Sequence, residues 1–313
     1  MSRALANLLL LTAGAIWGMG FVAQSTAMDA VGPLLFVALR FAVATVAMLP
    51  FAMIEARRAP RPLSRGDMRA FVGIGLLLTG GMIVQQIGML TTSVTNAGFL
   101  TGLYVVMVPF VAVALFRERP HPVIWPGAAL AFAGIFLLSG GKISALATGN
   151  WLNILCAAFW AFQVFMIGRY AAGTGRPVTL AVTQFAVCFA IAAVLAAIYE
   201  PFPLDGIRAA LPEILFAGVV SGGIAFTIQV IGQRYTTAPQ AAIFLSTEAV
   251  FAAIFAAIIL GERLPPSGLL GCAMIFAAIL LVELAPHARA KLARRGASRP
   301  EDDRRAGCDQ REA

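Results

Sequence analysis

The chain has 313 residues, of which 60% are hydrophobic and only 12% are charged. Soluble domains carry about 25% charged residues, and a soluble fold of this size could not bury so much apolar surface. The composition therefore excludes a soluble globular protein. The formal net charge of +8 would suggest nucleic-acid binding in a soluble chain. Here the basic residues lie in loops and in the tail, where they act as topology signals, so no nucleic-acid partner is expected.

Apolar runs long enough to cross a bilayer recur along the whole chain. A transmembrane helix needs about 20 mostly apolar residues, and the runs predict an all-α integral membrane protein with about ten such helices. The expected spans lie near residues 5–24, 33–54, 70–90, 96–116, 123–140, 150–169, 178–199, 212–232, 239–260 and 265–284. The first run resembles a cleaved signal peptide, but it has a counterpart later in the chain, which favours a true span.

The last segment, residues 286–313, is charged, lacks aromatic residues and has no apolar face. We predict a disordered cytoplasmic tail, which could also touch anionic lipid headgroups. Three of the four cysteines lie inside apolar runs, and the two histidines, His121 and His287, are far apart in loops. No metal-site spacing is present, and no metal or cofactor is expected.

The distribution of Lys and Arg predicts the orientation. If the N-terminus is cytoplasmic, clusters such as residues 57–69 and the tail fall on the inner side, whereas only Lys142, Arg208 and Arg263 fall on the outer side. The positive-inside rule then places both termini in the cytoplasm. We therefore expect a multi-pass protein of a bacterial-type inner membrane, in contact with membrane lipid and compatible with a monomer.

The sequence aligns with itself when it is shifted by 144 residues. The run from Gly88 to Arg119 matches the run from Gly232 to Arg263, and at a shift of 143 Trp17 meets Trp160. The match predicts two repeats, residues 1–142 and 143–285. Each repeat contains five expected spans, an odd number, so the halves must be inverted relative to each other. Inverted repeats are typical of secondary transporters that work by alternating access.

Four segments show a family resemblance: GAIWGMGFV at 14–22, LRFAVA at 39–44, VPFVAVALFRER at 108–119 and STEAVFAAIFAAIILGERL at 246–264. The chain resembles the EamA-type ten-helix permeases of the drug/metabolite transporter superfamily over roughly residues 5–284. This resemblance implies two five-helix repeats, a central cavity and export of amino acids or other metabolites. Branches of the superfamily export aromatic amino acids, or threonine and homoserine, and no motif here chooses between them.

Two ionisable residues lie deep inside expected spans. At 1.5 Å per residue, Arg40 lies roughly 10 Å and Glu248 roughly 18 Å from the outer ends of their helices. Such groups are costly in lipid and usually face the protein interior. They either pair with each other and hold the fold, with Arg40 extending toward the outer surface as a second structural option, or face a cavity. In a cavity, Arg40 would bind a substrate carboxylate, and Glu248 would bind an amine or carry a coupling proton.

Amides and aromatic residues inside the spans are further candidates for substrate contact. The default role of a membrane-embedded amide is a helix–helix hydrogen bond. Residues that pair under the repeat are better cavity candidates, because the pseudo-axis relates them. The candidates are Trp17, Trp160, Gln85, Gln229, Tyr104 (the repeat counterpart of Glu248) and Gln163.

Glu118-Arg119 and Glu262-Arg263 end the fourth and ninth spans on opposite sides of the membrane. We interpret them as structural ion pairs or helix-end locks, with a gating role as the alternative.

Other functions receive less support. An enzyme would need a catalytic constellation, which the sequence lacks, so no enzymatic activity is expected. A channel would need a polar stripe that lines a pore. The favoured interpretation is export of amino acids, aromatic or other neutral ones. The alternatives are broad drug or metabolite efflux, lipid translocation and a channel-like function.

Overall fold

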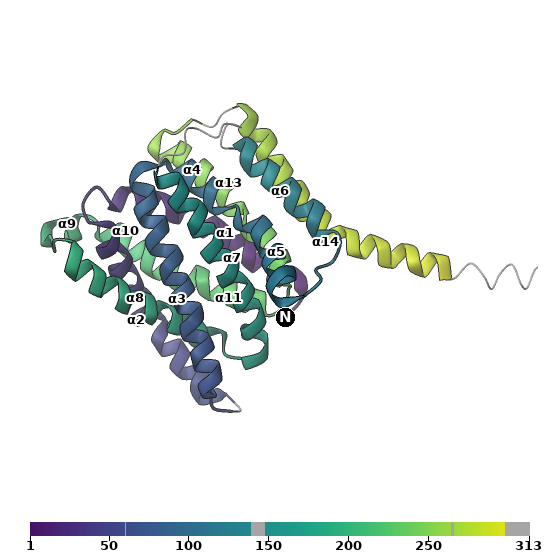
Figure 1. Cartoon of the computed structure of the whole chain (residues 1–313), viewed down its shortest axis with the longest axis horizontal. Helices are drawn as coiled ribbons and strands as arrows, with labels where there is room; N and C mark the ends of the chain where they lie inside the picture. The colour runs from purple at the N-terminus through teal and green to yellow at the C-terminus, as the bar shows by residue number, and fades with distance from the viewer. Residues whose placement is uncertain (60, 139–147, 264–265, 298–313) are drawn as a thin grey trace, which may run out of the picture.

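The computed structural model describes residues 1–59, 61–138, 148–263 and 266–297, and every regular element within these ranges is helical. Figure 1 shows a bundle of long helices. The elements of the first half are α1 (Arg3–Ala27), α2 (Pro33–Arg58), α3 (Arg65–Gly88), η1 (Met89–Thr91), α4 (Val94–Thr101), α5 (Tyr104–Phe116) and α6 (Ile124–Leu138). Those of the second half are α7 (Thr148–Thr174), α8 (Pro177–Tyr199), α9 (Leu204–Ala209), α10 (Leu211–Leu215), η2 (Phe216–Ala225), α11 (Phe226–Gln233), α12 (Ala238–Leu245), α13 (Thr247–Phe255), η3 (Ala256–Leu260) and α14 (Pro266–Ala297).

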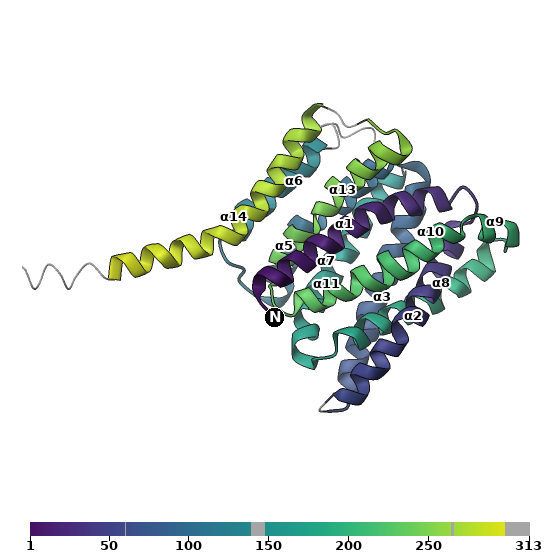
Figure 2. The ribbon, with the colours of Figure 1, turned by 180° about the vertical axis from the view of Figure 1, so that it is seen from behind.

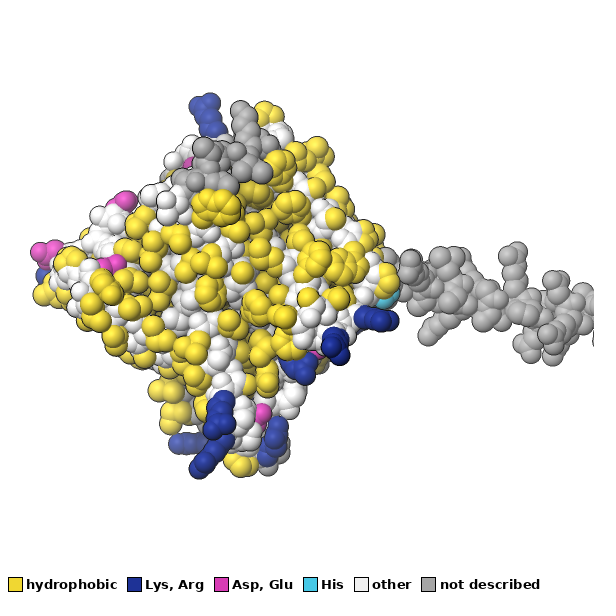
Figure 3. All heavy atoms as spheres, viewed as in Figure 1, with side chains coloured by type: hydrophobic (Ala, Val, Ile, Leu, Met, Phe, Trp, Pro, Cys, Tyr) yellow, Lys and Arg dark blue, Asp and Glu magenta, His cyan; other side chains and the backbone are white. Residues whose placement is uncertain are grey.

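The helices confirm the expectation of an all-α membrane protein. Among the described residues, eight helical segments are long and apolar enough to cross a bilayer, and they coincide with eight of the ten expected spans. The fifth and tenth expected spans correspond to shorter apolar segments, Ile124–Leu137 and Pro266–Val282. Figure 3 shows that apolar side chains cover most of the visible face of the bundle. A soluble protein rarely exposes so large an apolar patch, whereas lipid is a suitable solvent for it.

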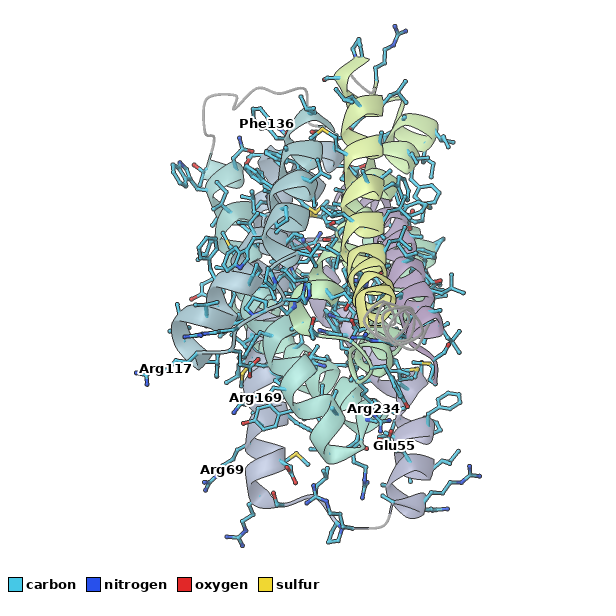
Figure 4. The ribbon with its side chains drawn as sticks, turned by 90° about the vertical axis from the view of Figure 1, so that its right-hand side faces the viewer. Glu55, Arg69, Arg117, Phe136, Arg169 and Arg234 are labelled. Atoms are coloured by element: carbon cyan, nitrogen blue, oxygen red, sulfur yellow. The ribbon has the colours of Figure 1, made fainter. Side chains whose placement is uncertain are left out.

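Basic side chains gather at one end of the molecule. Figure 4 shows Arg69, Arg117, Arg169 and Arg234 toward this end and Phe136 toward the other. We call the first the basic end and the second the opposite end. Figure 3 shows most of the visible Lys and Arg side chains near the basic end.

The two halves contribute equivalent helices that pack against each other. α2 and α8, which begin at the repeat-related prolines Pro33 and Pro177, lie side by side in both views (Figures 1 and 2). α6 and α14 also pair, at the edge of the bundle (Figures 1 and 2). Proline suits the first turn of a helix because its missing N–H has no intrahelical partner there.

Within the described residues, the fourth, eighth and ninth expected spans are interrupted along their length. The fourth is broken between α4 and α5 at Gly102, and the ninth is broken between α12 and α13 at Ser246, which is the repeat counterpart of Gly102. The eighth contains the π-helix η2 between α10 and α11. Apolar periodicity does not reveal such breaks. In transporters with inverted repeats, discontinuous helices mark the binding site at the membrane midplane.

Two sequence expectations concern segments at the boundary of the described residues. The expected boundary between the repeats, at residues 142 and 143, lies outside the described residues. α14 continues to Ala297, past residue 286, where the disordered tail was expected to begin. The remainder of that tail, residues 298–313, also lies outside the described part of the chain.

Candidate functional site

A cavity lies where the broken helices meet the centre of the bundle. Its walls combine aromatic rings, amides and two ionisable side chains. They are formed by Trp17, Phe21, Gln24, Arg40, Met82, Gln85, Thr101, Tyr104, Trp160, Val164, Ser221, Phe226, Gln229, Leu245 and Glu248.

The cavity walls follow the internal repeat. All of the lining residues except Gln24, Arg40 and Ser221 pair with another lining residue when the sequence is shifted by 143 or 144 positions. The pairs are Trp17/Trp160, Phe21/Val164, Met82/Phe226, Gln85/Gln229, Thr101/Leu245 and Tyr104/Glu248. Each half therefore contributes the same positions to one shared site.

The structure brings most of the candidate residues together. Seven of the eight candidates line the cavity, namely Arg40, Glu248, Trp17, Trp160, Gln85, Gln229 and Tyr104. Gln163 does not, because its amide donates a hydrogen bond to Oε1 of Gln184 at 2.9 Å, joining α7 to α8. It therefore has the default role of a membrane-embedded amide, a bond between helices.

Arg40 is only 1% exposed, yet it lacks an acidic partner among the described residues. Its Nη2 donates to Oγ of Ser221 at 3.2 Å, and its guanidinium lies over the rings of Phe36 and Phe41. Nε and Nη1 make no hydrogen bond within the described protein. A buried cation with free donors, aimed at a cavity, is suited to bind an anionic group.

Ser221 also positions Trp17. The backbone carbonyl of Ser221 accepts a hydrogen bond from Nε1 of Trp17 at 3.1 Å, while its hydroxyl accepts from Arg40. Ser221 lies in the π-helix η2, and π-helical turns occur frequently at functional sites. Since its repeat counterpart is Leu77, the repeat gives no signal for Ser221, and sequence reasoning missed it.

Glu248 is 4% exposed and lies in the first turn of α13, directly after the break in the ninth span. Its Oε1 makes no hydrogen bond within the described protein. Tyr104, the repeat counterpart of Glu248, lines the same cavity, and its hydroxyl makes no hydrogen bond within the described protein. No described ion pair joins Arg40 to Glu248. The two ionisable groups therefore face the cavity as separate sites.

Two amides, those of Gln85 and Gln229, also line the cavity. An amide carries no charge and can both donate and accept hydrogen bonds. Nε2 of Gln85 donates to Oγ1 of Thr101 at 3.0 Å. Neither amide atom of Gln229 has a hydrogen-bond partner within the described protein. Repeat-related amides thus differ, with one engaged and one free to bind a polar group.

Aromatic rings form the apolar part of the cavity. Phe226 lies between the two tryptophans, with ring centroids 4.7 Å from Trp17 and 5.8 Å from Trp160. Sequence reasoning missed Phe226. The repeat holds a weak signal for it, since Phe226 and Met82 both precede the glutamine of their half by three residues. The three rings offer flat faces to an apolar or planar group.

The four residues proposed for structural or gating roles lie outside the cavity. Glu118 forms an ion pair with Arg169 at 2.9 Å, and Glu262 accepts hydrogen bonds from the first turn of α4. Neither glutamate pairs with the arginine that follows it, Arg119 or Arg263, among the described residues. Each contacts another helix instead.

An all-helical membrane protein with a cavity lined by equivalent positions of two sequence repeats, and bordered by broken helices, has the architecture of a membrane transporter. The chain belongs to the EamA-like transporter family, whose profile matches residues 4–140 and again residues 147–284. This finding confirms the resemblance seen in the sequence.

Individual proteins agree with this assignment. An uncharacterized transporter of Archaeoglobus fulgidus is 30% identical over 284 residues, which cover 91% of this chain and 87% of that protein. The uncharacterized inner membrane transporter YedA of Escherichia coli is 26% identical over 253 residues, covering 78% and 68% of the two chains. A crystal structure with a TM-score of 0.74 and 20% identity covers 91% of this chain and 98% of its own, and has the same fold.

Proposed function

We propose that this membrane transporter moves small metabolites by alternating access across a bacterial-type inner membrane, and that it exports amino acids, aromatic or other neutral ones. The observation that carries the proposal is the cavity itself. It holds one buried cation and one buried carboxyl group, each with atoms that lack a hydrogen-bond partner within the described protein. Buried polar atoms are normally satisfied, so these atoms are available to a solute.

The chemistry of the walls matches a zwitterion. The free donors of Arg40 suit a carboxylate, which can accept two parallel hydrogen bonds from a guanidinium. The free Oε1 of Glu248 suits an ammonium group. A surface for an aromatic or apolar side chain is formed by Trp17, Trp160 and Phe226. Each part of an amino acid would thus meet a matching group.

Glu248 also supports coupling to protons. An ionised carboxylate is costly in a buried site without a cationic partner, so we propose that Glu248 is protonated whenever no substrate amine is bound. A proton and the amine would then compete for one carboxyl group. Such competition couples the movement of substrate in one direction to the movement of a proton in the other.

Basic residues are enriched on the cytoplasmic side of membrane proteins. The arginines gathered at the basic end therefore support a cytoplasmic location for that end and for both termini. In this orientation α1 begins in the cytoplasm, and residues that follow α8, such as Asp205, lie outside. A topology assay on single-cysteine variants with a membrane-impermeant thiol reagent would test the orientation. The proposal expects labelling of Asp205→Cys in intact cells and protection of Arg57→Cys.

Transport in proteoliposomes tests the function. The purified protein would be reconstituted and supplied with a panel of labelled amino acids, with and without a pH gradient. The proposal expects counterflow of a class of neutral amino acids, with net flux that collapses when the gradient is removed. Flux of unrelated drugs or of lipid, with none of any amino acid, would contradict it.

A further inference from the structure

Glu118 and Glu262 occupy equivalent positions in the two halves. Each follows a residue with left-handed backbone, Arg117 with φ 54° and Gly261 with φ 70°. The N–H of Glu118 donates to the carbonyl of Ala112 at 2.9 Å, and the N–H of Glu262 donates to that of Ala256 at 3.2 Å. The two turns therefore present the two carboxylates in the same way, one at each end of the molecule.

The carboxylate at the opposite end holds a neighbouring helix. Glu262 accepts hydrogen bonds from the backbone N–H groups of Val94 and Thr95 at 3.2 and 3.3 Å. It also accepts one from the hydroxyl of Thr95 at 2.5 Å. These donors lie in the first turn of α4, where backbone N–H groups lack intrahelical partners and favour an anion. Glu262 thus fastens the end of the ninth span to the start of the fourth.

The equivalent contact at the basic end is not made. The repeat counterparts of Val94 and Thr95 are Ala238 and Pro239, at the start of α12. Glu118 instead pairs with Arg169, and both side chains are about half exposed. A crevice lies between Glu118 and the start of α12, and Arg169, Ala238 and Pro239 also form its walls. Figure 4 shows Arg169 at this end of the molecule.

The crevice and the cavity are both bordered by α7. Phe165 lines the crevice, and the preceding residue, Val164, lines the cavity. Ala112 and Ala256, the carbonyl partners of the two turns, are repeat counterparts. Ala112 borders the crevice although it is only 2% exposed, and Ala256 is fully buried. The two ends thus differ in the partner that each glutamate binds, although their sequences correspond.

We propose that Glu262 and Glu118 are alternating latches of the transport cycle. The Glu262 latch on α4 is closed in this structure, and the Glu118 latch on α12 is open. When the basic end closes, Glu118 leaves Arg169 and accepts hydrogen bonds from the start of α12, while Glu262 releases α4. The exposed ion pair with Arg169 is suited to this exchange because exposed pairs contribute little stability.

The donors available to each latch explain why this state is the one observed. Pro239 has neither an N–H nor a hydroxyl group, so α12 cannot offer the two donors that Thr95 provides to Glu262. The start of α12 offers the N–H of Ala238 and the Thr236 hydroxyl, which is buried without a hydrogen-bond partner among the described residues. The latch at the basic end is therefore the weaker one, and the crevice at that end stays open.

Cysteine labelling tests the latches without a known substrate, although the proposal rests on alternating access. Reporter variants Ala112→Cys and Ala256→Cys are made in a background with the native cysteines replaced by alanine, and a small methanethiosulfonate reagent measures accessibility. We expect Ala112→Cys to react faster than Ala256→Cys. Glu262→Gln should raise labelling at position 256 several-fold and lower it at position 112.

Pro239→Thr provides a gain-of-function variant, since it restores the donors that Thr95 supplies in the other half. It should lower labelling at position 112, and adding Glu118→Gln should reverse that effect. Glu200→Gln is the matched control, because Glu200 also binds the start of a helix, α2, but not at either latch. It should leave both labelling rates unchanged.

The outcomes separate this proposal from that of the substrate. Unchanged labelling in both Glu262→Gln and Pro239→Thr would overturn the latches even if amino acids are transported. Altered labelling as described would support the latches even if no amino acid is transported. Equal change in Glu200→Gln would also overturn them, because the effect would then follow from any lost helix cap.

Discussion

Glu55 and Glu200 bind α2 and α8 to each other reciprocally. Each glutamate lies at the end of one of these helices and accepts hydrogen bonds from the start of the other. Glu55, near the end of α2, accepts hydrogen bonds from the N–H groups of Val178 and Thr179 at 3.0 and 2.7 Å, at the start of α8. Glu200, directly after α8, accepts from Leu34 and Leu35 at 2.9 and 2.8 Å, at the start of α2. The reciprocal contacts require α2 and α8 to be antiparallel. Because these helices are repeat counterparts, the relationship is the one that inverted halves produce.

The reciprocal caps predict a stability effect. Glu200→Ala and Glu55→Ala should each lower the free energy of unfolding by about 1 kcal/mol, since each removes a carboxylate from first-turn N–H groups that lack intrahelical partners. Thermal unfolding in detergent measures the effect. Asp205→Asn is the control, because the Asp205 side chain is 99% exposed. A melting temperature for Glu200→Ala equal to that of the control would show that the cap contributes nothing.

Gly18 predicts a close contact between α1 and α13. A Cβ atom at Gly18 would lie 2.7 Å from the backbone nitrogen of Ala252, and one at Gly14 would lie 2.5 Å from Oγ1 of Thr247. Gly18→Val should therefore destabilise the fold by about 1–3 kcal/mol or more through overpacking. Gly73→Ala should be nearly neutral, since nothing lies within 4 Å of the added atom. Size-exclusion profiles and unfolding curves distinguish the two variants, and equal behaviour would contradict the packing.

The counterpart positions Arg117 and Gly261 should respond differently to substitution. Arg117 has φ 54°, a left-handed conformation that disfavours side chains. Gly261 adopts φ 70° without strain. Arg117→Gly should leave the free energy of unfolding unchanged or raise it. Gly261→Ala should lower the free energy of unfolding by about 1 kcal/mol. The same unfolding assay tests both variants. A loss of stability in Arg117→Gly with none in Gly261→Ala would contradict this account of the turns.

Substitution of Ser221 should lower the affinity for the transported solute without unfolding the protein. Ser221→Ala removes the hydrogen bond that positions Nη2 of Arg40 but keeps the carbonyl that binds Trp17. We expect KM for the transported solute to rise by about tenfold, which corresponds to about 1.4 kcal/mol, with little change in maximal rate. Thr183→Ala is a control outside the cavity, since its hydroxyl bonds only to the carbonyl of Thr179. An unchanged KM in Ser221→Ala would show that Arg40 needs no positioning.

Composition predicted the membrane spans, and the internal repeat indicated several of the residues that line the cavity. The apolar runs indicated the spans because lipid demands continuous apolar surface. The repeat pointed to Trp17, Trp160, Gln85, Gln229 and Tyr104, since positions near a pseudo-axis meet at one place. Gln163 had no such support, as its counterpart at a shift of 143 is Gly20.

The features that sequence could not predict depend on packing in three dimensions. The breaks at Gly102 and Ser246 and the π-helix η2 leave the apolar pattern unchanged. Ser221 became visible as a site residue only once η2 placed it against Arg40 and Trp17. Glu55, Glu200 and Glu262 each bind a helix distant in sequence, and no local motif reports such a partner.

The most direct measurement of the central claim is transport by variants of the two ionisable cavity residues. Proteoliposomes containing Arg40→Gln, Glu248→Gln or the wild-type protein would be compared in counterflow of the best amino acid, with Asp205→Asn as a folded control. The account predicts that both cavity variants lose at least tenfold in rate at low substrate, that N-acetylation or esterification of the amino acid abolishes competition in the wild type, and that the control transports normally. Wild-type rates in both Arg40→Gln and Glu248→Gln would contradict it.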